Sequence, residues 1–467
     1  MSYPQREKYP KHSLQVYAAG WSSSLHFIIS HSQRWFRFHV NEKQRAISEE
    51  RLLRRMPFFR SVHSETDPTA PAIATISRVQ LDAPNRYLNT LTIKPTFPST
   101  SAPPPTVLLH GYGAGLGFFF HNFPPLANWA ANRGASVYAV DWLGMGRSAR
   151  VPFTVKAKKD DIPARVAEAE SFFIDALEEW RTKMGLKSMT IVGHSLGAYL
   201  SVAYALKYPE RVHKLILLSP AGVPHNPDTE EPEREFRDNE AEIQHSQPPA
   251  PKEQSTFQRA TDRRAEKVNP SPEKKPAESR SRRLFHYLWE EGWSPFQVLR
   301  STVFWGPLLI GKVSSSISYP FPSPNYQRHE QYTSRRFNGL SPEETRDLHD
   351  YITNITLAKG SGEYCISHLL GFGAHAHLPL VDRVYALRKD MRVTFMYGDH
   401  DWMDPRGGKE SVDRMKAAGN PNGRLKIIQD AGHHCEYPLS LVLKISTDAG
   451  SFLQCILIIK NKRTSSL

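Results

Sequence analysis

The chain has 467 residues, enough for one large domain with insertions or for two domains. Its 60 Lys and Arg residues outnumber its 47 Asp and Glu residues, and the formal net charge of +13 favours an anionic partner, either nucleic acid or anionic lipid. No nucleic-acid-binding motif is present, no apolar run reaches the ~18 residues of a spanning helix, and three distant cysteines do not indicate a disulfide framework. We therefore expect a protein that is soluble or lies on a membrane surface, without a nucleic acid partner.

Residues 1–76 are predicted to form a basic and amphipathic leader. Residues 1–41 contain one acid, Glu7, against five Lys and Arg residues. This composition is compatible with an organelle transit segment and equally with a disordered terminus, and both interpretations stay open. Residues 43–56 follow with an arginine-rich face, and they are predicted to form a solvated surface helix.

Short apolar runs that end in turn residues recur from residue 77 onward, and helical stretches separate most of them. They are "PTVLLHG" (105–111), "ASVYAVDWLG" (135–144), "MTIVGHS" (189–195), "HKLILLSPAG" (213–222), "MRVTFMYGDHD" (391–401) and "GRLKIIQDAGHH" (423–434). Strands that alternate with helices indicate a mostly parallel sheet covered on both faces. The sheet domain is predicted to comprise residues 77–223 and residues 386–445.

Between the two halves of the sheet domain the composition changes twice. Residues 224–283 contain two aromatic residues, Phe236 and Phe257, and nine prolines, so they are predicted to form a disordered charged insert. Residues 284–385 return to bulky apolar and helical patterns and are predicted to form a helical cap. The last residues, 446–467, are predicted to be a tail without assigned structure.

The pentapeptide "GHSLG" (193–197) lies between an apolar run and a helix predicted over 196–208. A serine hydroxyl is a weak nucleophile until a base removes its proton, and a sharp strand-to-helix turn presents it to substrate. Glycines two residues before and after Ser195 keep side chains away from the neighbouring strand and helix in such a turn. The pattern predicts that Ser195 attacks a carbonyl.

An acid and a histidine follow Ser195 in the chain order that α/β-hydrolases use. Asp401 lies in a turn after one predicted strand, and His433 lies in the loop after the next. His433 is predicted to be the general base, and Asp401 is predicted to fix its tautomer. Asp399 and Asp404 are the rival candidates for the acid.

Backbone N–H groups complete the predicted site. The segment "LLHGYGAG" (108–115) ends a strand in a glycine-rich loop. The N–H of Tyr112, flanked by Gly111 and Gly113, is predicted to stabilise an oxyanion together with the N–H of Leu196. Two such donors and an activated serine make an acyl-transfer site.

No metal and no other cofactor is expected. His375 and His377 form an H-x-H pair, but no third ligand accompanies it, so we predict an ordinary loop. Cys435 lies close to His433, yet a cysteine nucleophile would leave the serine turn at 193–197 unexplained.

Taken together, these segments resemble the α/β-hydrolases of the abhydrolase domain 4/5 type, and they are most similar to the fungal mitochondrial cardiolipin-specific deacylase. The resemblance runs over "VLLHGYGAGLGFFFHNFPPLA", "VYAVDWLGMGRSAR", "IVGHSLGAYLSVAYALKYPERV", "LILLSPAGVP", "GWSPFQVLRS" and "VTFMYGDHDWMD". It implies an α/β-hydrolase fold, action on membrane phospholipids, and a cap that shapes an acyl channel.

Two departures from the family pattern bear on activity. The coactivator branch of the family has asparagine at the nucleophile position, whereas this chain has Ser195, which implies a hydrolase. The family also has an H-x-x-x-x-D signature that is linked to lysophosphatidic acid acyltransferase activity. Here Pro438 stands five residues after His433, and Leu439 stands five residues after His434, so the acid of that signature is missing.

The leading hypothesis is a serine lipase that hydrolyses a fatty acyl ester of a membrane phospholipid, with cardiolipin as the candidate. The alternatives are a lysophosphatidic acid acyltransferase and a non-catalytic lipid-surface coactivator of another lipase. The expected partners are the phospholipid substrate and, peripherally, a membrane surface, without an obligate protein partner. The resemblance implies an intracellular location at the mitochondrial inner membrane, with the cytoplasm and lipid droplets as alternatives.

Five large aromatic residues gather in the first part of the predicted cap: Trp289, Trp293, Phe296, Phe304 and Trp305. They either line the interior of the cap or lie at lipid headgroups, where indole rings are favoured. In the second case the nearby Arg282, Arg283 and Arg300 would add attraction to anionic lipid.

Overall fold

The computed structural model describes residues 41–60, 69–226, 287–289, 291–301, 340–371, 373–429 and 431–433. Most of the charged insert predicted for 224–283, the tail predicted for 446–467 and the acidic signature position near Pro438 lie outside these ranges.

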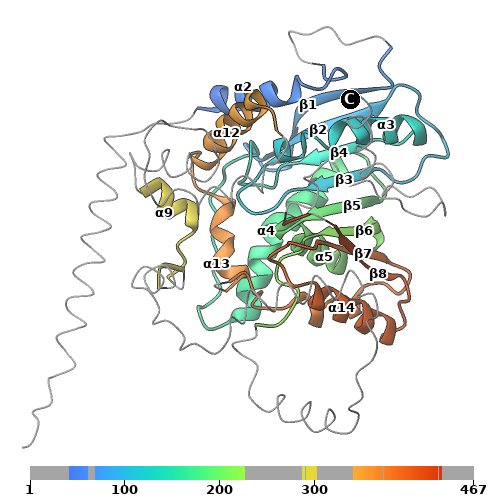
Figure 1. Ribbon diagram of the computed structural model, residues 1–467. Helices are drawn as coiled ribbons and strands as arrows, with labels where there is room; N and C mark the ends of the chain where they lie inside the picture. The colour runs from blue at the N-terminus through green and yellow to red at the C-terminus, as the bar shows by residue number, and fades with distance from the viewer. Residues whose placement is uncertain are drawn as a thin grey trace, which may run out of the picture.

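One sheet organises the described residues, and it contains eight strands in the order β1-β2-β4-β3-β5-β6-β7-β8 (Figure 1). They are β1 (Ala72–Gln80), β2 (Tyr87–Pro95), β3 (Thr106–Leu109), β4 (Val137–Val140), β5 (Met189–His194), β6 (Val212–Leu218), β7 (Arg392–Gly398) and β8 (Gly423–Ile428). β1 pairs antiparallel with β2, and β2 pairs antiparallel with β4. The pairings from β4 to β8 are all parallel, which confirms the mostly parallel sheet.

Helices cover both faces of the sheet. They are α2 (Glu42–Leu53), α3 (Phe123–Arg133), α4 (Ile162–Lys183), α5 (Leu196–Lys207), α9 (Pro295–Ser301), α12 (Pro342–Thr356), α13 (Ile366–Leu369) and α14 (Pro405–Ala417). α4, α5 and α14 contribute to one apolar cluster, and α2, α3 and α12 contribute to the other, on the opposite face. Parallel strands buried on both sides read as continuous apolar runs, and β5 is buried at every position. None of the helices in the described ranges is long and apolar enough to cross a bilayer.

The boundary of the sheet domain predicted at residue 77 is wrong, because the domain begins earlier. β1 begins at Ala72, whose register partner is Pro95 on β2. The sequence of β1 mixes apolar and polar residues, and only Ala72 and Ala74 are buried in this edge strand, so its pattern is weaker than a fully apolar run.

The prediction of a solvated helix over 43–56 is also wrong in part. α2 begins after Asn41, whose side chain accepts a hydrogen bond from the N–H of Gln44 in a capping box. Leu52 and Leu53 are fully buried, and the helix packs against α12. The arginine-rich face contacts acids of α12 and does not simply face water, since Arg51 forms an ion pair with Asp350.

The cap lies at the carboxyl-terminal ends of the parallel strands, with α12 and α13 packed on the sheet domain. α12 begins with a capping box in which Ser341 and Glu344 satisfy each other's backbone N–H groups. Tyr351 of α12 is fully buried, and its hydroxyl accepts a hydrogen bond from the N–H of Gly117. Together with α9, these elements provide the described part of the predicted cap.

Candidate active site

The turn that contains Ser195 joins β5 to α5. Ser195 has φ 54° and ψ −119°, a conformation that side-chain-bearing residues rarely adopt and that marks stored strain. A Cβ atom on Gly193 would lie 2.6 Å from the carbonyl oxygen of Gly197, and one on Gly197 would lie 2.5 Å from the carbonyl oxygen of Leu109. The glycines are therefore needed for close packing, as the sequence predicted. The Ser195 N–H donates to the carbonyl of Leu218, which fixes the turn on β6.

Ser195, His433 and Asp401 form a continuous chain of hydrogen bonds. Nε2 of His433 lies 3.1 Å from Oγ of Ser195, and Nδ1 lies 3.0 Å from Oδ1 of Asp401. The Asp401 side chain is fully buried, so its charge acts on the imidazole with little screening by water. The proton on Nδ1 leaves Nε2 free to accept the serine proton. The structure thus brings together the three residues predicted from the sequence.

The two rival acids have other partners. Asp399 accepts hydrogen bonds from His400 Nδ1, at 2.7 Å, and from the N–H of Ala431. Asp404 caps α14 and forms an ion pair with Arg406. The hydrogen bonds described here for Asp399 and Asp404 do not involve His433. Asp401, whose Oδ1 lies 3.0 Å from Nδ1 of His433, is therefore the candidate acid of the triad.

Two further residues hold His433 in place. Nε2 of His194, the residue before the nucleophile, lies 3.1 Å from the backbone carbonyl of His433. The ring of Trp402 lies 4.9 Å from the His433 ring, centroid to centroid. In the sequence, His194 adjoins Ser195 and Trp402 adjoins Asp401. Their contacts with His433, however, depend on how β5 and β8 are placed in space.

The predicted oxyanion donors lie beside Ser195. Among the described residues, no backbone acceptor outside the helices and strands takes a hydrogen bond from the N–H of Leu196 or of Tyr112. A Cβ atom on Gly111 would lie 3.0 Å from Cβ of Ser195, so the loop that carries Tyr112 reaches the nucleophile closely. Gly113 has φ 65°, in the left-handed region that favours glycine.

His110 orients this loop from behind. Its Nδ1 lies 2.8 Å from the carbonyl of Gly111, and its Nε2 accepts the N–H of Trp142. Burial lowers the pKa of His110, so the ring is neutral and carries its proton on Nδ1. The sequence motif contained this histidine, but its positioning role was not predicted.

The sequence is similar to a known protein family and to several known proteins. Residues 104–299 match the alpha/beta hydrolase fold family. The described residues have the α/β-hydrolase fold. A probable 1-acylglycerol-3-phosphate O-acyltransferase of Oryza sativa subsp. japonica is 32% identical over 339 residues, which are 71% of this chain and 63% of the rice protein. The chain therefore spans less than two thirds of that relative.

Two human relatives have lipid-related names. The (lyso)-N-acylphosphatidylethanolamine lipase is 29% identical over 306 residues, covering 66% of this chain and 68% of the relative. The 1-acylglycerol-3-phosphate O-acyltransferase ABHD5 is 45% identical over 130 residues, covering 28% of this chain and 33% of the relative. These relatives confirm the resemblance to abhydrolase domain 4/5-type proteins, while the similarity to the fungal cardiolipin deacylase stays a prediction.

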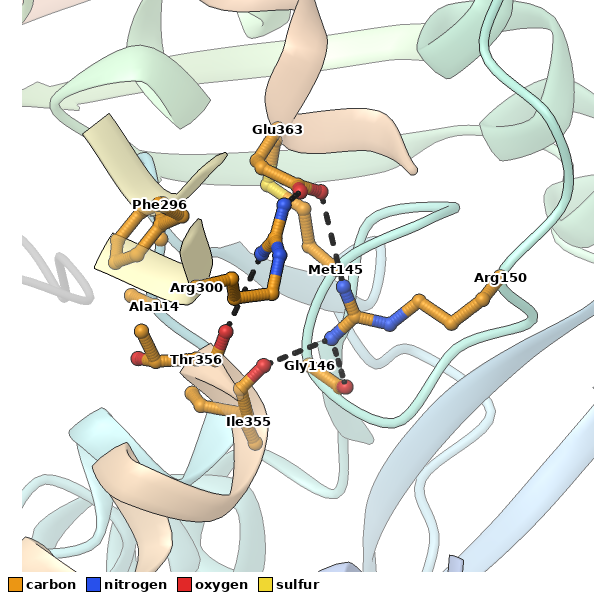
Figure 2. A pocket seen from close by; sticks show the side chains of 10 residues that line it. Ala114, Met145, Gly146, Arg150, Phe296, Arg300, Ile355, Thr356 and Glu363 are labelled. Atoms are coloured by element: carbon orange, nitrogen blue, oxygen red, sulfur yellow. Dashed lines mark hydrogen bonds and ion pairs between the residues drawn. The ribbon is translucent and has the colours of Figure 1, made fainter. Parts of the chain in front are cut away.

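A small, open pocket adjoins the predicted oxyanion loop. Gly113 and Ala114 form one wall, and the side chains of Arg150, Arg300 and Glu363 meet at the other, as Figure 2 shows. This cluster could not be predicted from the sequence, because Arg150, Arg300 and Glu363 come from three separate stretches that no local motif joins.

The aromatic group in the cap contacts the protein interior where it is described. Trp289 packs against the core, and its Nε1 donates to the carbonyl of Leu370 at 3.0 Å. Phe296 lies 5.1 Å from the Tyr112 ring, centroid to centroid, and its ring covers Gly113. Phe304 and Trp305 lie outside the described residues. These contacts favour the interior alternative for Trp289 and Phe296.

Arg300, which would add attraction to anionic lipid if the aromatic residues lay at headgroups, makes contacts within the protein. Arg300 on α9 forms an ion pair with the buried carboxylate of Glu363 and donates to the carbonyl of Thr356. Its side chain is 18% exposed. Arg282 and Arg283 lie outside the described ranges.

Among the described residues, no group of three or more His, Cys, Asp and Glu side chains is placed to hold a metal ion. Nε2 of His377 lies 3.1 Å from the carbonyl of Ser367, and the backbone of His375 accepts a hydrogen bond from Gly371. Both histidines therefore serve local structure. Burial raises the pKa of the Cys365 thiol well above its usual range, which makes it a poor nucleophile.

Proposed function

We propose that the protein is a carboxylic ester hydrolase that removes a fatty acyl chain from a membrane phospholipid. The observation that carries the proposal is the hydrogen-bonded chain from Asp401 through His433 to Ser195. This arrangement requires a substrate with an electrophilic carbonyl, and an acyl ester supplies one.

The geometry supports a two-stage reaction. Oγ of Ser195 attacks the ester carbonyl while Nε2 of His433 takes the serine proton. The N–H groups of Tyr112 and Leu196 hold the negative oxygen of the tetrahedral intermediate. His433 then gives its proton to the departing alcohol, and an acyl-enzyme remains on Ser195. A water molecule, deprotonated by His433, attacks this acyl group; the bond between the acyl carbon and Oγ of Ser195 then breaks, Oγ takes the proton back from His433, and the fatty acid leaves.

The choice of a lipid ester is supported by the names of the relatives, one of which is a lipase and others acyltransferases of a lysophospholipid. We infer that the substrate lies in a membrane surface and that the protein binds there peripherally. Cardiolipin as the substrate and the mitochondrial inner membrane as the location are further parts of this proposal.

Acyl transfer to a lysophospholipid is the second candidate. The rice relative's name favours it, and the chemistry differs only in the second stage. A lipid hydroxyl would replace water as the group that attacks the acyl-enzyme on Ser195. The missing acid at Pro438 speaks against this candidate. The intact triad speaks against the third hypothesis, a non-catalytic coactivator.

A fluorophosphonate probe tests the proposal directly, because it labels activated serines. Wild type should be labelled, Ser195→Ala should not, and Ser171→Ala should be labelled normally, since Ser171 lies on the surface of α4. An unlabelled wild-type protein would contradict the enzyme proposal. Product analysis then separates the two reactions: hydrolysis releases free fatty acid, whereas acyl transfer converts added lysophosphatidic acid into phosphatidic acid.

A further inference from the structure

The pocket beside the oxyanion loop holds more positive than negative charge. Arg150 enters from the loop after β4, and Arg300 enters from α9 in the cap. Glu363 lies between them: its Oε1 pairs with Arg300, and its Oε2 lies 3.8 Å from Nη1 of Arg150. Figure 2 shows both guanidinium groups directed toward this one carboxylate. One anion therefore faces two cations at the pocket wall.

More distant charges do not change this balance. Arg45 and Asp141 also act on Arg150, with opposite signs. Arg45 has its own ion pair with Glu42, at 2.8 Å. Asp141 accepts hydrogen bonds from the backbone N–H groups of Leu116 and Arg147 and so serves the core loops. The local excess of positive charge remains with Arg150 and Arg300.

Arg150 itself is incompletely satisfied. Its two Nη groups donate to four backbone carbonyls, those of Gly144, Gly146, Ile355 and Lys359. Its Nε is buried and has no acceptor in the described part of the chain. Only 10% of the side chain is exposed, and burial lowers the pKa of Arg150 to about 10. A buried cation of this kind gains stability from an additional anion nearby.

The pocket is also close to the reacting atoms. Gly113, on its wall, follows Tyr112 directly, and the same loop touches Ser195 through Gly111. Consecutive Cα atoms are about 3.8 Å apart, so Gly113 and Gly111 are separated by at most about 8 Å. A glycerophospholipid carries its ester carbonyl and its phosphate on one three-carbon backbone, which spans a comparable distance.

We propose that Arg150 and Arg300 bind the phosphate group of the lipid substrate and so select phosphorylated over neutral glycerolipids. Guanidinium groups suit phosphate oxygens because their donors are paired in one plane. Glu363 holds the two guanidinium groups in place, and its negative charge limits their affinity for the lipid phosphate. The assignment rests on the proposed function, because only an acyl ester at Ser195 would bring a lipid phosphate to this pocket.

Three probes separate the possible sources of the phosphate. Hydrolysis of a soluble p-nitrophenyl ester by the wild-type protein is measured with octanoyl lysophosphatidic acid, mono-octanoylglycerol or inorganic phosphate as inhibitor. The first two differ only in the phosphate group. We expect the phosphorylated lipid to inhibit at about a tenfold lower concentration, equivalent to ~1.4 kcal/mol of binding free energy. Equal inhibition by the two lipids would overturn the proposal, and so would inorganic phosphate acting as strongly as the phosphorylated lipid.

Substitutions at Arg300 and Glu363 test the site. Arg300→Gln should abolish the difference between the two lipids, and Arg300→Lys should keep part of it. Glu363→Gln should enlarge the difference severalfold, because it removes the competing negative charge. Arg54→Gln is the matched control, since Arg54 pairs with Glu50 on the surface and should leave the difference unchanged. If Arg300 and Glu363 only fasten the cap, Arg300→Gln and Glu363→Gln weaken inhibition by the two lipids to the same extent. That result would contradict a phosphate site.

Failure of the proposed function can be distinguished from failure of the phosphate site. If wild type hydrolyses no ester, the proposed function fails, and the same lipid pair is compared by thermal shift instead. A larger stabilisation by the phosphorylated lipid would then support the binding site alone, and equal shifts would overturn it.

Discussion

Glu49 on α2 and Arg147 in the loop after β4 form an ion pair inside the protein, with Oε1 of Glu49 2.5 Å from Nη1 of Arg147. Burial raises the pKa of the Glu49 carboxyl to about 7, against the opposing effect of Arg147, and the charge of Asp141 adds to the increase. The side chain of Asn89 donates hydrogen bonds to the carboxylates of Glu49 and Asp141 and holds these two groups side by side. The helix that precedes the sheet domain is thus attached through a group that titrates near neutral pH.

This pair predicts a pH dependence of stability. The pKa of Glu49 is higher in the folded protein than its ordinary value of 4.5, so the folded state keeps a proton that the unfolded state loses as the pH rises from about 4.5 to about 7. The free energy of unfolding should therefore fall across this range. Glu49→Gln cannot titrate and should show a shallower decline in denaturant unfolding, whereas Glu50→Gln, at a more exposed position, should follow wild type. Parallel curves for all three proteins would contradict the role of Glu49.

Ser195→Ala should lower esterase activity by roughly a thousandfold or more, because only binding and the oxyanion donors remain. The fold should persist, since the change removes one hydroxyl group. Steady-state kinetics on a soluble ester, with circular dichroism as the check on folding, tests this. Retention of more than a tenth of wild-type activity would show that another residue is the nucleophile.

Asp401→Asn should reduce kcat by roughly 10³–10⁴-fold, because an amide favours the wrong tautomer of His433. Asp404→Asn provides the matched control three residues away. Asp404 caps α14 through its side chain, and asparagine caps a helix equally well, so activity and stability should stay close to wild type. The acid would be misassigned if the two variants changed kcat to the same extent.

Trp289→Ala should destabilise the protein by about 2–4 kcal/mol, because the indole packs on the core and donates to Leu370. Tyr287→Ala, at a side chain that is 59% exposed, should change stability by less than about 0.5 kcal/mol. Chemical denaturation measures both. A loss of binding to anionic vesicles in Trp289→Ala at unchanged stability would instead support the headgroup interpretation.

The catalytic residues could be predicted because each one follows a strong local signal. Ser195 has a glycine on either side of a strand-to-helix turn, Asp401 follows the buried strand β7, and His433 follows the partly buried strand β8. Parallel strands bring such ends together at one edge of the sheet, so the order along the chain was enough to assign the roles.

Other features depend on contacts between distant segments, which no local pattern contains. Arg150 and Arg300 belong to a loop and a cap helix, and only the packing of the cap brings them to Glu363. α2 was misjudged for a related reason: its arginines dominate the pattern, although their partners are acids on α12. A charge on a predicted helix does not reveal whether water or another helix faces it.

β6 ends at Leu218 and β7 begins at Arg392, yet the two strands are neighbours in the sheet, with Lys214 in register with Arg392. Residues 219–391, an excursion in chain order, therefore separate two strands that are neighbours in the sheet. Ser195, Asp401 and His433 are encoded outside this excursion, whereas Arg300 and Glu363 are encoded inside it. Substitutions in the excursion can therefore change the proposed phosphate site without touching the residues of the triad, which the two halves of the sheet domain contribute.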